Sequence, residues 1–147
     1  MSHGHTKPKV AIVIINWKTW HHIEGCLNSL KQLNYPNYEI IVVDNASGDD
    51  SPDKIAAAFP EVTLLRSDKN LGTSGGNNAG MKYALEHGSD YVWLLNNDTV
   101  APADTLDILV QSAQTSPKIG MVSPVLYNEH QRDQVQYCGS SYNWQKF

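Results

Sequence analysis

The chain has 147 residues, of which 41% are hydrophobic and 18% are charged, and these proportions are typical of one globular domain with a hydrophobic core. Its formal net charge at pH 7 is -4 without long runs of like charge, so it offers no basic surface for nucleic acid or for an anionic membrane. The apolar run at residues 10–15 is too short for a membrane span and the two cysteines show no CxxC spacing, so we expect a cytoplasmic protein with free thiols.

Apolar runs of strand length alternate along the chain with stretches in which apolar residues recur at helical spacing. In chain order, these patterns predict a strand at 10–16, a helix at 23–30, a strand at 39–44, a helix at 51–59, a strand at 62–66, a helix at 75–88, a strand at 91–95, a helix at 102–113 and a strand at 119–122.

Strands that are apolar on both faces and alternate with helices indicate a doubly wound α/β fold, with a mostly parallel sheet covered by helices on both faces. From Ser123 onward the periodicity fades, and the remaining residues have room for two short strands but no helix. We therefore expect a polar tail over residues 1–9, an α/β domain over residues 10–122 and a separate region over residues 123–147.

Polar side chains follow the predicted strands at their carboxyl ends. In an open α/β sheet, ligands bind beyond these ends, because loops and helix N-termini converge there. Asp44 and Asp98 each come at the end of an apolar run, which places both carboxylates on the same rim of the sheet. Trp17 ends the first strand, where its indole either belongs to the core or offers a surface on which a flat ring can stack.

The residues alone leave two interpretations open for each carboxylate. Asp98 either makes an Asx-turn onto the loop backbone or serves as a hard oxygen ligand for Mg²⁺ or Mn²⁺. Asp44 is either a solvated turn residue or a fixed acceptor for ribose hydroxyls or a base N–H group.

The standard nucleotide-binding fingerprints are absent after the first strand, where the chain reads NWKTW. A glycine-rich segment, NLGTSGGNNAG, instead follows the third predicted strand. At the predicted start of the next helix, Gly75 and Gly76 either let backbone N–H groups approach an anionic ligand or only make a tight turn and a close contact between helix and sheet.

Four motifs, in their order and spacing, resemble the nucleotide-binding half of the family 2 glycosyltransferases, the inverting enzymes of the GT-A fold. These motifs are VAIVIINW, IIVVDNASGDDS, NLGTSGGNNAG and WLLNNDTV. GGNNAG and LLNNDT are most similar to bacterial rhamnosyltransferase-type members that build surface polysaccharides. The resemblance implies a Rossmann-like sheet, a UDP- or dTDP-linked sugar donor, and a saccharide or lipid-linked saccharide acceptor.

The resemblance also implies roles for single residues around the nucleotide. Ile15 and Trp17 would line the base pocket, and Asp44 would hold the uracil or thymine and the ribose. Asn77 would lie near the nucleotide, at a position where many relatives have an arginine.

The family's DxD motif falls on Asn96, Asn97 and Asp98, so this chain keeps only the last acid. By resemblance, Asp98 would bind the divalent cation, Mn²⁺ or Mg²⁺, that bridges the diphosphate, and Asn96 would contact water or ribose. Loss of the first carboxylate predicts weak metal binding before the nucleotide arrives.

The mechanism that the resemblance implies is a single displacement at the anomeric carbon, in which a carboxylate takes the proton of the acceptor hydroxyl. In relatives this base lies well beyond the acid at the strand end. Glu129 and Asp133 occupy a polar stretch that predicts a surface turn, and neither matches the motif. We therefore expect the N-terminal portion of a longer transferase without its catalytic base, in which residues 123–147 are the truncated start of the acceptor-side region. The full-length form could lie at the inner face of the membrane.

Two other classes of function stay open: a nucleotide-sugar-binding or regulatory module without catalysis, and a receiver-like domain phosphorylated on Asp44. The receiver class ranks last, because the chain lacks the acidic pair after the first strand and the distal lysine. We expect the four histidines of the N-terminal region to face solvent. Two of them lie in the polar terminus, and the other two are adjacent on a predicted helix, where they point about 100° apart and do not readily chelate one ion. They are His3, His5, His21 and His22.

Overall fold

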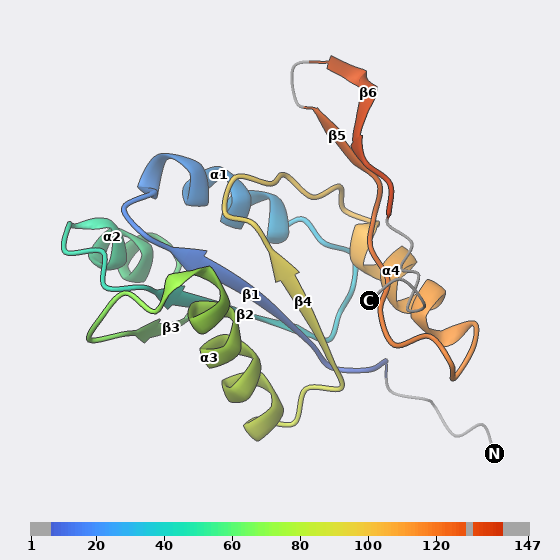
Figure 1. Cartoon of the computed structure of the whole chain (residues 1–147), viewed down its shortest axis with the longest axis horizontal. Helices are drawn as coiled ribbons and strands as arrows, with labels where there is room; N and C mark the ends of the chain where they lie inside the picture. The colour runs from blue at the N-terminus through green and yellow to red at the C-terminus, as the bar shows by residue number, and fades with distance from the viewer. Residues whose placement is uncertain (1–6, 129–130, 140–147) are drawn as a thin grey trace, which may run out of the picture. The chain divides into compact units, whose positions relative to one another are not determined.

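The computed structural model describes residues 7–128 and 131–139, and the chain divides into two compact units, Met1–Asp104 and Thr105–Phe147 (Figure 1). The first unit contains β1 (Val10–Asn16), α1 (Trp20–Leu30), β2 (Tyr38–Asp44), α2 (Ser51–Ala58), β3 (Thr63–Arg66), α3 (Gly72–Glu86) and β4 (Tyr91–Leu95). The second contains α4 (Thr105–Gln114), β5 (Leu126–Asn128) and β6 (Gln131–Tyr137).

The first unit is built on a sheet of four parallel strands in the order β3-β2-β1-β4, which confirms the predicted α/β fold. β1 is central and pairs with β2 and β4 along its length. In this register Asn16 lies opposite Asp44, and Ile14 lies opposite Leu95. The carboxyl ends of these three strands therefore lie side by side on one rim.

One face of the sheet packs against α3. Its core contains Ala11 and Val13 of β1, Ile41 and Val43 of β2, and Ala84 of α3, all fully buried. A methyl group on Gly80 would overlap the side chain of Val13 and lie 3.2 Å from Val43 Cγ2, so glycine permits this close approach of helix and sheet.

The other face of the sheet is covered by α1 and α2. Alternation along a strand points Ile12 and Ile14 away from α3, and both are completely buried. Ile23 and Leu27 of α1 and Ile55 of α2 are completely buried as well. Figure 1 shows α3 on the opposite side of the sheet from α1, so helices cover both faces as predicted.

The strand predicted at residues 119–122 is wrong. These residues form no strand, and Met121 is 89% exposed. The run is short, has Gly120 at its centre and lies between two prolines, which cannot donate to a sheet ladder. The expected pair of short strands follows instead as an antiparallel pair, β5 and β6, and the described residues after 123 form no helix.

Three helices begin at other residues than predicted. α1 begins three residues earlier, at Trp20, and α3 begins three residues earlier, at Gly72, whereas α4 begins three residues later than Pro102, at Thr105.

Among the described residues, no helix has both the length and the apolar composition needed to cross a membrane.

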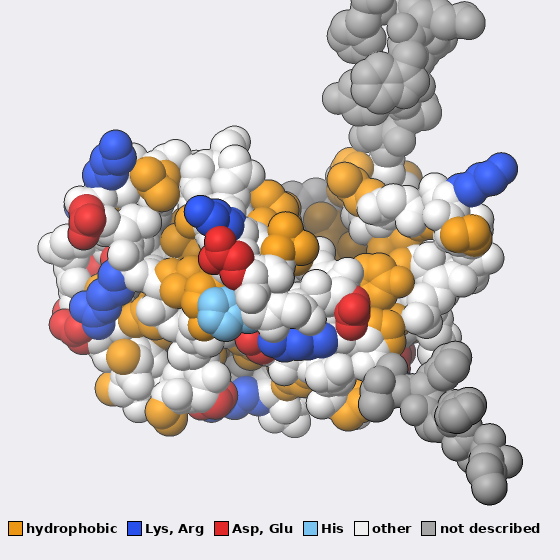
Figure 2. Space-filling model, turned by 90° about the horizontal axis from the view of Figure 1, so that it is seen from below, with side chains coloured by type: hydrophobic (Ala, Val, Ile, Leu, Met, Phe, Trp, Pro, Cys, Tyr) orange, Lys and Arg blue, Asp and Glu red, His pale blue; other side chains and the backbone are white. Residues whose placement is uncertain are grey.

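Charged side chains of both signs are mixed on the surface. Figure 2 shows one face on which Lys and Arg side chains alternate with Asp and Glu, without a large patch of either sign. Surface ion pairs such as Lys9–Glu39 (2.8 Å) and Lys31–Glu61 (2.8 Å) reflect this mixing, and each such pair contributes about 0–1 kcal/mol to stability.

Candidate functional site

An open pocket of about 280 Å³ lies at the carboxyl ends of β1 and β4, beside the first turns of α3. Its lining residues are Ile15, Trp17, Thr19, Thr73, Asn77, Leu95, Asn96, Asn97 and Asp98. The structure therefore brings together five of the six predicted site residues, namely Ile15, Trp17, Asn77, Asn96 and Asp98. The sixth, Asp44, does not line this pocket.

Trp17 stands on the rim of the pocket, outside the core. Its side chain is 49% exposed, which excludes the interpretation of this tryptophan as a core residue. The ammonium group of Lys18 lies 5.5 Å from the centroid of the indole ring. Lys18 also has a φ of 59°, in a region that residues other than glycine seldom adopt. The turn after β1 thus presents an aromatic face and a cation at the edge of the pocket.

Among the described residues that line the pocket, Asp98 has the only ionisable side chain. Both Asp98 and Asn96 are exposed, so their oxygens are accessible from solvent. No group of three or more His, Cys, Asp or Glu side chains with metal-site geometry occurs within the described ranges. The donor set therefore fits a divalent cation that takes one carboxylate from the protein and its other oxygens from water and substrate.

Asn97, between these two residues, is partly buried and points into the protein. Its Nδ2 group donates to the backbone oxygen of Ile15 at 2.8 Å and to Oγ1 of Thr19 at 2.8 Å. The loop after β4 is thereby attached to the turn after β1.

Asp44 belongs to a buried hydrogen-bond network behind the pocket. The carboxylate is 4% exposed and accepts from the Nδ2 of Asn16 at 2.8 Å, and from the hydroxyl and backbone N–H of Ser47. Asn16, which is fully buried, also donates to Ser51 Oγ at 2.8 Å, and its Oδ1 accepts from Thr19 Oγ1 at 3.1 Å. Sequence reasoning missed Asn16, because an amide at the end of an apolar strand carries no signal of its partners.

Asn45 fixes the start of α3. Its Oδ1 accepts from the backbone N–H of Leu71 at 2.8 Å, and its Nδ2 donates to the Gly72 oxygen at 3.2 Å and to Asn70 Oδ1 at 3.0 Å. Gly72 has a φ of 68°, which glycine adopts without strain. The helix therefore begins before the glycine pair, and Thr73 in its first turn faces the pocket.

Gly75 and Gly76 consequently lie inside α3 and not at its start, which corrects the prediction for these two residues. A methyl group on Gly76 would lie 3.1 Å from Ile15 Cδ1, and one on Gly75 would lie 2.6 Å from Leu71 Cβ. These glycines therefore permit close packing of the helix on the strand end, and the leading N–H groups of the helix belong to earlier residues.

Cys26 of α1 is buried beneath the loop after β4. Its thiol lies 3.7 Å from the Asn96 backbone oxygen, to which it donates. Burial, together with the negative charge of Asp98, raises the pKa of the Cys26 thiol to about 12. This thiol is therefore a packing group and a poor nucleophile.

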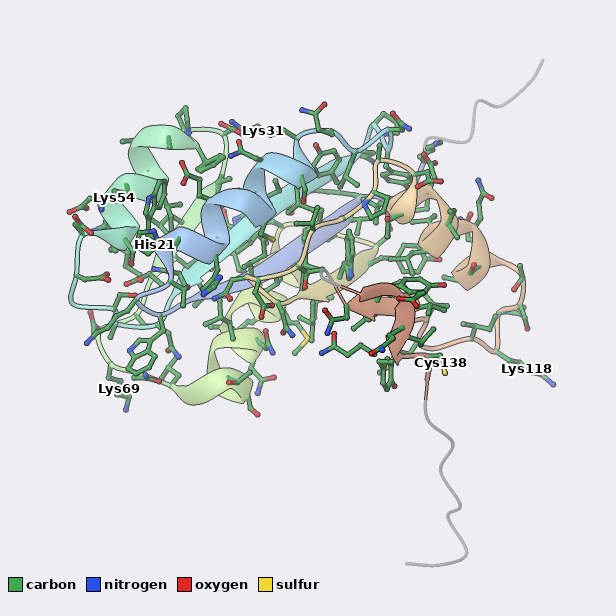
Figure 3. The ribbon with its side chains drawn as sticks, turned by 90° about the horizontal axis from the view of Figure 1, so that it is seen from above. His21, Lys31, Lys54, Lys69, Lys118 and Cys138 are labelled. Carbon is green, nitrogen blue, oxygen red and sulfur yellow. The ribbon has the colours of Figure 1, made fainter. Side chains whose placement is uncertain are left out.

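The remaining candidates are Asp133, Glu129 and the four histidines of the N-terminal region. Asp133 is exposed and lies within β6, so the turn predicted for it is wrong, because the polar stretch pairs as a hairpin strand. Glu129, His3 and His5 lie outside the described residues. Both His21 and His22 are exposed in the first turn of α1, as expected, and Figure 3 labels His21 there.

Comparison with known proteins identifies relatives of this chain. Residues 11–144 match the family described as Glycosyl transferase family 2. The galactofuranosyltransferase GlfT1 of Mycolicibacterium smegmatis is 37% identical over 121 residues, which are 81% of this chain and 39% of the relative. The N-acetylglucosaminyl-diphospho-decaprenol L-rhamnosyltransferase of Mycobacterium tuberculosis (strain ATCC 25618 / H37Rv) is 24% identical over 123 residues, which are 78% of this chain and 40% of the relative.

Two solved structures have a similar fold. The mannosyltransferase PcManGT from Pyrobaculum calidifontis, in complex with GDP-Man and Mn²⁺, gives a TM-score of 0.64 at 26% identity, over 77% of this chain and 34% of that one. S. aureus TarS (residues 1–349) gives a TM-score of 0.63 at 21% identity, over 71% of this chain and 32% of that one. This chain thus spans about a third of the length of the curated relatives it matches (32% for GlfT1 of M. tuberculosis). Together with the parallel sheet and the pocket on its rim, the match over residues 11–144 shows that the chain belongs to glycosyl transferase family 2 and has the GT-A fold.

Proposed function

We propose that this chain forms the donor site of a glycosyltransferase that takes a sugar from a UDP- or dTDP-linked donor. The observation that carries the proposal is the convergence of an exposed indole, Trp17, and a lone carboxylate, Asp98, on one pocket of a family 2 chain. An aromatic face accommodates a nucleobase, and a carboxylate with a bound cation accommodates a diphosphate.

The base and ribose would occupy the side of the pocket next to β1. Trp17 offers its half-exposed indole as a stacking surface, and Ile15 supplies an apolar contact at the strand end. Asn77 on α3 and Asn96 after β4 place amide groups that can donate to or accept from ribose and phosphate.

Asp44 is proposed as the acceptor for the base N–H or a ribose hydroxyl. Because its carboxylate is 4% exposed and bonded to Asn16 and Ser47, this contact requires the turn at residues 46–48 to move. Ala46 at a φ of 57° and Gly48 at a φ of 67° mark this turn as a tight one.

Asp98 is proposed to hold the divalent cation, Mn²⁺ or Mg²⁺, with diphosphate oxygens completing the shell. The bound cation would neutralise charge on the departing nucleoside diphosphate. The complex of PcManGT with GDP-Man and Mn²⁺ supports this assignment. With a single protein carboxylate in the lining, metal and nucleotide are expected to bind together.

In the proposed reaction, an acceptor hydroxyl attacks the anomeric carbon as the bond from that carbon to the diphosphate oxygen breaks, with inversion. The hydroxyl proton passes to a carboxylate base that no described residue is assigned to provide. The names of two relatives, the decaprenol-linked rhamnosyltransferase and an Escherichia coli glucosyltransferase acting on GlcNAc-diphosphoundecaprenol, support a lipid-linked saccharide acceptor, surface polysaccharide synthesis and, from the first, a rhamnosyl donor.

A nucleotide-sugar-binding module without catalysis is the second candidate. The observation that favours it is that the part of the lining the structure describes contains no second carboxylate. The receiver-like interpretation fails, because residues 11–144 match a glycosyltransferase family.

The base pocket is tested by titrating UDP, dTDP and ADP into the wild type and the Trp17→Ala variant by calorimetry. Binding of UDP or dTDP is expected to weaken by roughly 5- to 150-fold in the variant, since base stacking on an aromatic side chain contributes about 1–3 kcal/mol. Failure of the wild type to bind any nucleoside diphosphate at millimolar concentration would remove the proposed donor site.

A further inference from the structure

The three polar side chains of the loop after β4, residues 96–98, point in two directions. All three residues line the pocket, but Asn96 and Asp98 are exposed, whereas Asn97 is partly buried and its amide donates to the backbone oxygen of Ile15 at the end of β1. The side chains of the outer two residues are therefore open to solvent and ligand, whereas the Nδ2 group of the middle one is already bonded to protein.

We propose that Asn97 is a positioning residue that fastens the loop after β4 to the turn after β1 and thereby sets the distance between Asp98 and Trp17. This inference rests on the proposed function, since it concerns the two ends of the proposed donor site.

Two hydrogen bonds from one amide make this attachment. Both are 2.8 Å long and reach Ile15, 82 positions away in sequence, and Thr19, 78 positions away. Ile15 and Thr19 flank Trp17, so the amide holds both ends of the segment that carries the exposed indole. Asp98 follows Asn97 directly, so the same amide also holds the backbone that carries the carboxylate.

The Thr19 hydroxyl bonds to Asn97 and Asn16 and does not cap α1. It is the N-cap residue of α1, where a threonine hydroxyl usually accepts from the helix N–H groups, but it makes no side-chain cap bond. Its hydroxyl accepts from Asn97 and donates to Asn16 Oδ1 at 3.1 Å instead. The attachment therefore continues through Asn16 to Asp44 and joins the ends of β4, β1 and β2.

The two contacts of residue 97 require a hydrogen-bond donor at this position. The Ile15 carbonyl oxygen can only accept, and the Asn97 amide supplies the two N–H groups that the contacts need. An aspartate there would set a carboxylate against a carbonyl oxygen without a proton between them. Asn97→Asp is therefore a nearly isosteric change that breaks the attachment.

The test combines two readouts on wild type, Asn97→Ala, Asn97→Asp and Thr19→Val, with Asn28→Asp on the exposed surface of α1 as the charge-matched control. The first readout is the factor by which Mn²⁺ increases UDP or dTDP affinity in calorimetry. It is expected to fall at least fivefold in the Asn97 variants, although Asp98 is intact, and to stay at the wild-type value in Asn28→Asp. An unchanged factor in folded Asn97 variants would overturn the inference.

The second readout is the ¹H–¹⁵N spectrum of the ligand-free protein. Asn97→Asp and Thr19→Val are each expected to shift the amide signals of both segments, residues 17–19 and 96–98. Thr19→Val leaves residues 96–98 unaltered, so it keeps the test decisive if the Asn97 variants fail to fold. Shifts confined to the segment that carries the substitution would overturn the attachment. A wild type that binds no nucleotide but shows coupled shifts would refute the donor site and leave the attachment standing.

Discussion

Replacing Asn16 by leucine should destabilise the fold strongly. Leucine has nearly the same size, so the change keeps the buried volume and removes every hydrogen bond of the amide. The Asp44 carboxylate loses a donor at 2.8 Å, and Thr19 loses the acceptor of its hydroxyl at 3.1 Å. A hydrogen bond to a charged group contributes about 1.5–3 kcal/mol and a neutral one about 0.5–1.5 kcal/mol, so the expected loss in the free energy of unfolding is roughly 2–4 kcal/mol.

Urea denaturation followed by circular dichroism measures this loss as a shift of the midpoint at constant slope. Asn28→Leu, on the exposed surface of α1, is the matched control, and it should change stability by less than about 0.5 kcal/mol. Because much of the cost comes from leaving the Asp44 carboxylate underbonded, Asp44→Asn should cost less in the Asn16→Leu background than in the wild type. A loss below about 1 kcal/mol, or strictly additive effects of the two substitutions, would show that Asn16 does not stabilise the Asp44 carboxylate.

Three further substitutions and one chemical modification test the packing. Gly80→Ala should destabilise the fold by about 1–3 kcal/mol, because the added methyl group overlaps the side chain of Val13. Gly25→Ala on α1 should stabilise the fold by up to about 1 kcal/mol, because no atom lies within 4 Å of the added methyl group. Equal effects of the two substitutions in urea denaturation would contradict this contrast. Iodoacetamide at pH 8 should modify exposed Cys138 and spare Cys26, whose pKa is raised to about 12, as mass spectrometry of the native protein would show. The pKa of this thiol rises from 9.0 to about 12 on folding, so above pH 9 the unfolded chain releases the proton while the folded protein keeps it, and the folded state becomes less stable. The Cys26→Ala variant lacks this effect and should lose less stability than the wild type between pH 9 and pH 10. Equal losses of stability in the two proteins would show that burial does not raise the pKa of the thiol.

The overall fold could be predicted from the sequence, because the strands of a parallel sheet are apolar on both faces and stand out as continuous runs. The rim followed from the same pattern: parallel strands end together, so residues after β1 and β4 had to converge. This is why Trp17 and Asp98, far apart in sequence, were expected together and line one pocket.

The inward contacts could not be predicted, because they depend on which way a loop side chain points. Asn96 and Asn97 are identical in type and adjacent, yet one is exposed and the other donates to the backbone of β1. The boundary of α3 was misjudged for a related reason. Asn45, which lies 27 positions before Gly72, fixes the helix start through a contact that no local pattern reveals.

The most direct test of the donor site is a calorimetric titration of UDP and dTDP, with and without Mn²⁺, into the wild type, Asp98→Ala and Glu24→Ala. Glu24 is exposed on α1, so its variant removes one negative charge outside the pocket. If Asp98 holds the cation, Mn²⁺ should strengthen nucleotide binding at least tenfold in the wild type and in Glu24→Ala, and this gain should disappear in Asp98→Ala. Nucleotide binding that ignores Mn²⁺, or a gain that survives the loss of Asp98, would contradict it.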